Sequence, residues 1–149
     1  MMVNRGTVEG FIHRTRVNLE LVEKSSEGHT IIQLMNSLLG IVVYPLAKDA
    51  FDQFKSQKIS TLGINEWSTK IQLMGDSNTV YDFVNHMRNA VSHGHITFSS
   101  DSRKLNDVII TFADRPGKNQ PFNWRVEFGG AELRQLCTRL MELIENTVG

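Results

Sequence analysis

The sequence predicts a mostly α-helical fold that ends in a small antiparallel β-sheet and one last helix. Three observations predict this class: apolar residues recur at helical spacing up to Gly94, β-branched and aromatic runs follow, and helical spacing returns after Gly130. A chain of 149 residues with 40% hydrophobic residues is long enough to bury one core and short for two. We therefore expect a single domain over residues 1–149.

Two helices are expected before Pro45. The first ends at the "SSEGH" stretch and has i, i+3 and i+4 spacing at Phe11, Ile12, Thr15, Leu19 and Val22. The second begins where Thr30 and Gln33 have the form of a capping box, and Pro45 closes it. Because this second helix is apolar around most of its circumference, we expect it at the buried centre of the fold.

A polar stripe interrupts the central helix. Helical spacing places its members on one face: Gln33, Asn36, Ser37 and Gly40. Small residues on such a stripe let a neighbouring helix approach closely. The alternative is that Asn36 lines a functional site.

Three more helices are expected between Pro45 and Gly94. One starts at Pro45 and buries Leu46, Ala50, Phe51 and Phe54, and a shorter one carries Trp67 and Ile71. The third follows "GDSN", where Asp76, Ser77 or Asn78 caps its start, and ends at Gly94 in a left-handed conformation. Its apolar stripe consists of Val80, Phe83, Val84, Met87 and Val91.

Beyond Gly94 the pattern is that of strands. The segments "HITF", "DVIITF" and "NWRVEF" are β-branched and aromatic, and the connector "ADRPGKNQP" is rich in turn residues, which predicts an antiparallel sheet. A last amphipathic helix follows Gly129 and Gly130. It is expected to bury Leu133, Leu136, Cys137, Leu140 and Ile144.

The composition limits the classes of function. Sixteen basic and sixteen acidic residues give a net charge of zero, so any binding of a polyanion must be local. The lone Cys137 excludes an intrachain disulfide and favours a reducing compartment. The start "MMVNRGTVEG" lacks the apolar region of a signal peptide, and the longest apolar stretch is too short and polar to span a bilayer. We expect a cytoplasmic protein with no membrane partner.

The stretch "MRNAVSHGH", residues 87–95, is the densest cluster of ionisable and polar side chains in the chain. The buried stripe centres on Met87, so polar side chains crowd the other face near the helix end: Asn85, Arg88, Asn89, Ser92 and His93. A solvated helix face has the same composition, and the spacing between Arg88 and His93 is common by chance. The residues alone leave both interpretations open.

The context of this stretch resembles a known family. "RNAVSH" at the end of an amphipathic helix is similar to the R-N-x-x-x-H signature of HEPN domains, named for higher eukaryotes and prokaryotes nucleotide-binding. "IIQLMNSLLGIVVYP" resembles the central helix of the plasmid-borne branch of that family, and Trp124 with "VEFGGAELRQL" resembles its terminal hairpin and helix. The resemblance covers most of the chain.

The resemblance implies a HEPN-like helical bundle and, in many members, a metal-independent endoribonuclease that needs no cofactor. It places catalysis on Arg88 and His93, supported by Asn89, Ser92 and Asn85. His93 can move protons at neutral pH, and Arg88 can hold the charge that builds on the phosphorane. Asn89 lies one turn before His93 and is expected to orient its ring. Attack by the ribose 2′-hydroxyl would leave a 2′,3′-cyclic phosphate.

The helix geometry points to a shared site. Residues five apart on a helix point roughly 140° away from each other, so Arg88 and His93 of one chain do not converge naturally on one phosphate. Two such helices packed across a two-fold axis would bring Arg88 of one chain to His93 of the other. The resemblance implies a homodimer that packs about this helix, and the geometry would give that dimer a composite site. Candidate RNA contacts, each also compatible with a solvated face, are Arg5, Arg14, Arg16 and Lys70.

Three other roles remain open. His86, His93 and His95 with Asp82 are chemically competent to bind zinc, although no compact metal-ligand motif is present and we expect no metal. A HEPN-like module could also keep the motif helix and bind RNA, a nucleotide or a protein without catalysis. The chain could further belong to a toxin–antitoxin or phage-defence system, in which an antitoxin protein masks the site.

Overall fold

The computed structural model describes residues 5–25, 29–47, 51–63, 71–73, 79–102 and 104–148. Within these ranges it has four α-helices: α1 (Arg5–Lys24), α2 (Thr30–Ala47), α4 (Val80–Ser92) and α5 (Gly130–Val148). The strands are β1 (Ile71–Leu73), β2 (Ile96–Phe98), β3 (Ile109–Asp114) and β4 (Trp124–Gly129), and the short 3₁₀ helices are η1 (Asp52–Phe54), η2 (Ile59–Leu62) and η3 (Leu105–Asp107). The predicted class, mostly helical with a small antiparallel sheet and a terminal helix, is confirmed.

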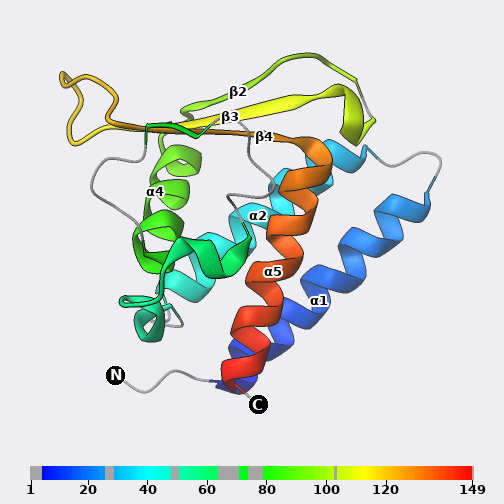
Figure 1. Cartoon of the computed structure of the whole chain (residues 1–149). Helices are drawn as coiled ribbons and strands as arrows, with labels where there is room; N and C mark the ends of the chain where they lie inside the picture. The colour runs from blue at the N-terminus through cyan, green and yellow to red at the C-terminus, as the bar shows by residue number, and fades with distance from the viewer. Residues whose placement is uncertain are drawn as a thin grey trace.

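The sheet has the order β1-β4-β3-β2, and all neighbouring strands are antiparallel. Side chains alternate along β4, where Trp124, Val126 and Phe128 are fully buried and the residues between them are half-buried. The buried face packs on α4 and α5, and the sheet lies across one end of the helices (Figure 1). No described helix covers the opposite face in that view. Strands β2, β3 and β4 fall on the three predicted segments.

Helix α2 lies at the centre of the helical layer, where it contacts α1, α4 and α5 (Figure 1). Its buried residues include Leu34, Leu38 and Ile41, and one cluster of buried side chains joins the helices to the sheet. The predicted burial of α2 is therefore confirmed. The residues predicted to be buried on α5 are all fully buried: Leu133, Leu136, Cys137, Leu140 and Ile144. In the described part of the chain, no helix combines the length and the hydropathy that a membrane crossing requires.

The polar stripe on α2 serves helix packing at its glycine. A Cβ added at Gly40 would come within 2.9 Å of the Phe11 ring on α1, so the missing side chain lets the two helices approach. Ser37 is 3% exposed and accepts a hydrogen bond from Gln33. Asn36 is exposed on α2. The interpretation as a close approach between helices is confirmed at Gly40 and Phe11.

The segment after α2 differs from the prediction. Helix α2 continues through Pro45 to Ala47, so no new helix starts at Pro45. Only two helical residues follow this proline, and it therefore interrupts the hydrogen-bond ladder close to its natural end. Ile71 belongs to strand β1, which pairs with β4 through the Cα register Ile71↔Val126. Local periodicity carries no signal for such a distant pairing. Ala50, Trp67 and Lys70 lie outside the described residues.

Two helix starts also lie one residue away from the predicted caps. Helix α2 includes Thr30, and the backbone N–H of Ile32 donates to Nδ1 of His29 at 3.4 Å. Helix α4 is capped by Thr79, whose Oγ1 accepts from the Asp82 backbone N–H at 3.2 Å. The predicted caps at residues 76–78 lie outside the described residues. In both cases any of several neighbouring polar side chains could cap the helix, and the sequence does not rank them.

Candidate functional site

The C-terminal end of α4 has the geometry of a Schellman motif. Gly94 adopts a φ of 70°, its N–H donates to the Val91 carbonyl at 3.2 Å, and the His95 N–H donates to the Ala90 carbonyl at 2.8 Å. The predicted end of this helix at Gly94 is confirmed. Since the chain then turns directly into β2, His93 and His95 lie on either side of this glycine, next to the sheet.

The core stripe of α4 leaves the motif residues outside the core. Four of the five predicted stripe residues, Val80, Phe83, Val84 and Met87, are fully buried. The fifth, Val91, is half-buried against the core, and its neighbour Ala90 is fully buried instead. By contrast, Arg88 and Asn89 are half-buried and His93 is exposed. The predicted supporting residues Asn85 and Ser92 are half-buried and exposed, respectively.

Asp114, at the end of β3, anchors the motif helix to the sheet. The residue is 3% exposed, and its Oδ2 lies 2.7 Å from Nδ1 of His86 and 3.0 Å from Nδ2 of Asn89. Its Oδ1 accepts from the Arg115 backbone N–H at 2.8 Å. Burial alone would raise the pKa of Asp114, but the hydrogen bonds from His86, Asn89 and Arg115 outweigh it and hold the pKa below its ordinary 3.8. The group is therefore a carboxylate that only accepts hydrogen bonds.

This carboxylate fixes the orientation of the Asn89 amide. Because Asp114 can only accept, the NH₂ group of Asn89 must face it, and the amide oxygen Oδ1 points the other way. That oxygen accepts from Nη2 of Arg88 at 3.0 Å. Asn89 thus connects the sheet to the motif arginine, instead of orienting the His93 ring through its side chain. The described residues show no hydrogen bond or ion pair between Arg88 and His93.

His86 is held by an aromatic contact as well as by Asp114. Its ring stacks on Trp124 with a centroid separation of 5.1 Å and an interplanar angle of 13°. Trp124 and Asp114 are register partners on β4 and β3, so the sheet places both beside the same turn of α4. Phe83 packs edge-on against the same indole at 5.7 Å. The sequence did not predict Asp114 or Trp124 as part of the site, because strand register brings them to α4.

A pocket of about 440 Å³ opens between the end of α4 and the loop from β3 to β4. We name it the hairpin pocket, and its lining consists of His93, His95, Arg115, Pro116, Gly117 and Lys118. His95 packs edge-on against His93 at 5.8 Å and against Phe122 at 5.0 Å. The Arg115 guanidinium lies 5.0 Å from the centre of the Phe122 ring. The motif histidine therefore shares a pocket with two basic side chains, Arg115 and Lys118.

The residues predicted to contact RNA lie elsewhere. Arg14 is exposed on α1, and Arg16 forms an ion pair of 2.7 Å with Glu145 on α5. Helix α1 is on the far side of α2 from α4 in Figure 1, so the structure does not bring these arginines to the hairpin pocket. Arg5 has a described backbone in α1, but its side chain lies outside the described residues, as does Lys70.

The zinc site considered from the sequence does not form among the described residues, where no three His, Cys, Asp or Glu side chains are placed to hold a metal ion. His86 is engaged by Asp114 instead. Cys137 is fully buried, and burial raises the pKa of its thiol to about 12. The thiol is therefore protonated at neutral pH and has no access to a substrate.

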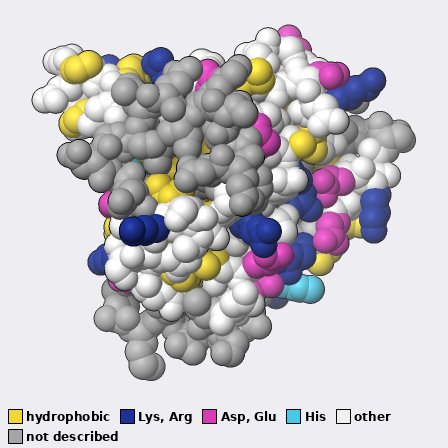
Figure 2. All heavy atoms as spheres, viewed as in Figure 1, with side chains coloured by type: hydrophobic (Ala, Val, Ile, Leu, Met, Phe, Trp, Pro, Cys, Tyr) yellow, Lys and Arg dark blue, Asp and Glu magenta, His cyan; other side chains and the backbone are white. Residues whose placement is uncertain are grey.

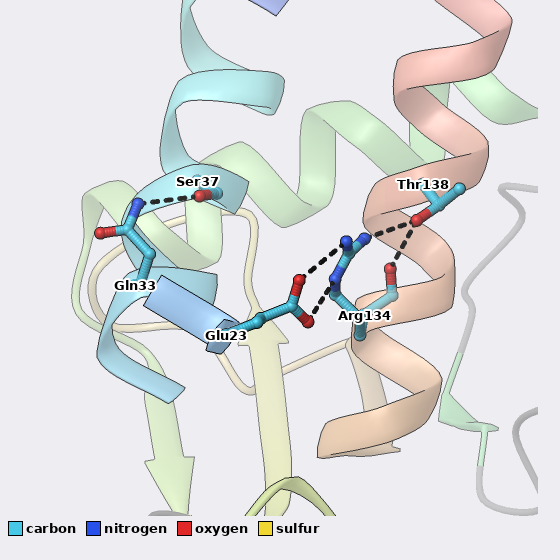
Figure 3. A network of polar contacts seen from close by, with 5 residues as sticks. All are labelled: Glu23, Gln33, Ser37, Arg134 and Thr138. Carbon is cyan, nitrogen blue, oxygen red and sulfur yellow. Dashed lines mark hydrogen bonds and ion pairs between the residues drawn. The ribbon is translucent and has the colours of Figure 1, made fainter. Parts of the chain in front are cut away.

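A second polar network, between α1 and α5, has a different form (Figure 3). Arg134 donates to both carboxylate oxygens of Glu23, at 2.9 and 3.1 Å, and to Oγ1 of Thr138 at 2.6 Å. The Thr138 hydroxyl in turn donates to the Arg134 carbonyl at 3.3 Å. The hydrogen bonds that Arg134 donates to Glu23 raise the pKa of Arg134. This network ties two helices together without any residue of the motif.

The whole chain is similar to one family of proteins. A family model described as HEPN pEK499 p136 matches residues 1–149. The match includes every element that contributes to the candidate site. No curated protein and no solved structure matches the chain.

Proposed function

Because the chain belongs to the HEPN pEK499 p136 family, we propose that this HEPN-type, nuclease-like module is a metal-independent endoribonuclease. One observation carries the proposal. Arg88, Asn89 and His93 match the R-N-x-x-x-H signature and lie outside the core, and His93 opens into a pocket with Arg115 and Lys118. A solvated helix face needs neither a buried carboxylate that fixes Asn89 nor a cationic pocket beside the histidine.

The chemistry is a transfer of phosphorus from one ribose oxygen to another. A base removes the proton of the 2′-hydroxyl, the 2′-oxygen forms a bond to phosphorus, and the bond to the 5′-oxygen of the next nucleotide breaks. The leaving oxygen takes a proton, and a 2′,3′-cyclic phosphate remains. His93 is exposed, and an imidazole side chain can serve as the base or as the acid. Arg88 would stabilise the charge on the phosphorane with its planar guanidinium.

The site is proposed to be shared between two protomers. Five positions along α4 separate Arg88 and His93 by roughly 140°, and the Arg88 guanidinium is directed to Asn89 within its own chain. A homodimer that packs α4 against its symmetry mate would place Arg88 of one protomer opposite His93 of the other. The homodimer and the composite site rest on this geometry and on the family resemblance.

The biological setting follows from the resemblance alone. The plasmid-borne branch of the family supports a role in a toxin–antitoxin or phage-defence system in the cytoplasm, with an antitoxin protein as a further partner. The competing proposal is a module that binds RNA, a nucleotide or a protein and does not cleave. The hydrogen bond from Arg88 to Asn89 within one chain fits the nuclease and the non-cleaving module equally well. The two proposals differ in whether Arg88 meets His93 of a second protomer.

An RNA cleavage assay on the purified chain tests the proposal. We expect cleavage that persists in excess EDTA, leaves cyclic phosphate ends and is lost in His93→Ala and Arg88→Ala. Both residues lie off the core stripe, so the two variants should keep the free energy of unfolding within about 1 kcal/mol of wild type. Val84→Asp and Leu38→Asp are controls that should unfold the chain, since each buries an unpaired charge.

Cleavage that stops with EDTA and returns with zinc or manganese would contradict the metal-independent mechanism. Binding of RNA without any cleavage would favour the inactive module.

A further inference from the structure

The hairpin pocket is cationic although the chain is neutral. The side chains of Arg115 and Lys118 line it together with two histidines, and no acidic residue belongs to its lining. Asp114, next in sequence to Arg115, is buried, and its oxygens already accept hydrogen bonds. On the face shown in Figure 2, by contrast, basic and acidic side chains are mixed. The pocket is thus a local site for an anion on a chain whose formal net charge is zero.

One cation of this pocket, Arg115, is held in place by an aromatic contact. Phe122 packs against the Arg115 guanidinium and against the edge of His95, each at 5.0 Å between centres. Nδ1 of His95 is buried and has no hydrogen-bond partner among the described residues, so packing rather than hydrogen bonding at this atom sets the ring position. A guanidinium held in this way loses less conformational entropy when it binds a phosphate.

A second pocket of about 530 Å³ adjoins the first and shares His95 with it. We name it the sheet groove, since it lies on the face of β2, β3 and β4 that no described helix covers. It combines the Phe122 ring with hydroxyl and charged groups from Thr97, Thr111, Arg125 and Glu127. An aromatic ring beside hydrogen-bonding groups is the surface that accommodates an unstacked nucleobase.

We propose that the two pockets together bind single-stranded RNA next to the cleavage site. A backbone phosphate beside the scissile one occupies the hairpin pocket on Arg115 and Lys118, and the adjacent base lies in the sheet groove on Phe122. Single-stranded RNA fits because its bases can turn out of the strand, whereas a duplex keeps them paired. The inference rests on the proposed function, since it takes His93 as the reacting end of the strand.

Binding measured without cleavage tests the inference. The probe is a short, fluorescently labelled single-stranded RNA of mixed sequence, and the protein carries Arg88→Ala, which removes cleavage and lies outside both pockets. On this background, Arg115→Gln with Lys118→Gln removes two cations from the hairpin pocket. The matched control, Lys104→Gln with Arg139→Gln, removes the same charge from exposed positions near η3 and on α5. Thermal unfolding confirms that both variants fold.

The expected readout is the dependence of affinity on salt. Loss of this phosphate contact should reduce the slope of log K against log salt by about 0.7, the contribution of one neutralised phosphate on a single strand. The control variant should keep the slope of the Arg88→Ala background. Phe122→Leu should reduce the affinity for the single strand several-fold and leave the weaker affinity for a duplex unchanged.

Three results would overturn the inference. One is an equal slope in the hairpin and control variants, and another is equal affinity of the unmodified pockets for single strand and duplex. The third is displacement of the RNA by polyglutamate at equal charge, which would assign the pocket to an acidic protein segment. Failure of the proposed function can be told apart from failure of this inference. If the protein does not cleave RNA but shows the expected salt slopes, the RNA-binding pockets stand and the nuclease proposal fails. If the protein cleaves RNA but the slopes are unchanged, the nuclease proposal stands and the pockets fail.

Discussion

Two polar networks connect distant parts of this chain, and they end differently. Between α1 and α5, Arg134 uses its donors on Glu23 and Thr138, and Thr138 turns back to the Arg134 carbonyl (Figure 3). The network is closed and partly exposed, with 26% of the Glu23 side chain accessible. Between β3 and α4, Asp114 is buried, and its contacts lead through Asn89 to Arg88 at the surface.

The difference separates stabilisation from positioning. A closed network satisfies all its members among themselves, so its removal changes how firmly two helices are joined. An open network leaves its last member oriented toward something outside it. In this chain that last member is Arg88, one of the three motif residues, and the scaffold behind it is a carboxylate with a lowered pKa. The predictions below test whether the two networks differ in this way.

The largest effect is expected from pairing two inactive variants. If Arg88 of one protomer works with His93 of the other, a heterodimer of Arg88→Ala and His93→Ala keeps one complete pair, while each homodimer keeps none. Co-expression of the two variants with different tags, followed by purification through both tags, should therefore restore RNA cleavage to at most half of the wild-type rate. A site within one chain predicts no recovery. A strictly monomeric protein in solution would also contradict the shared site.

An intermediate effect is expected when the hydrogen bond between Asn89 and Asp114 in the open network is broken and then restored with donor and acceptor exchanged. Asn89→Asp sets two carboxylates about 3 Å apart and removes the donor to Asp114, and we expect kcat to fall about tenfold to a hundredfold, the value of one hydrogen bond to a charged group. KM should change less, because the pockets are intact. Asn89→Asp with Asp114→Asn restores a donor facing an acceptor and keeps an acceptor for Arg88, so it should recover part of kcat.

The exchange also separates positioning from simple packing. A structural role predicts that the double variant is at least as unstable and inactive as the worse single variant. Asp114→Asn alone provides the reference for His86, which loses its anionic partner in both cases. Recovery of kcat in the double variant but not in Asp114→Asn would assign the effect to Asn89 and Arg88.

Much of the fold follows from local patterns in the sequence. The stripe on α4, the glycine at its end, the three strand segments and the buried face of α5 are all set by neighbours within a few residues, and each was predicted. The errors fall where the cause is distant or degenerate. Ile71 joins a strand because β4 lies beside it, and Thr79 caps α4 in a stretch with several competent caps.

The candidate site divides in the same way. Arg88, Asn89 and His93 were found because they lie on one helix, and their placement off the buried stripe follows from helical spacing. Asp114 and Arg115 were missed because β3 brings them to α4 from a distant part of the sequence. Asn89 and Asp114, for example, are 25 positions apart. Asp114 and Arg115 stand inside the connector "ADRPGKNQP", which local composition marks only as a turn. The sequence therefore predicts the motif, and the strand register supplies its scaffold and its pocket.

The smallest effect is expected from the closed network, and it completes the comparison. Glu23→Gln keeps the shape of the side chain and removes the charge that binds Arg134 through two hydrogen bonds. Since both side chains are partly exposed, the free energy of unfolding should fall by only about 1 kcal/mol, measured by urea denaturation, and less at high salt. Cleavage and RNA binding should equal wild type, because neither residue lies in the hairpin pocket or the sheet groove. A loss of kcat at unchanged stability would mean that α1 and α5 also position the site, and the distinction between closed and open networks would fail for this chain.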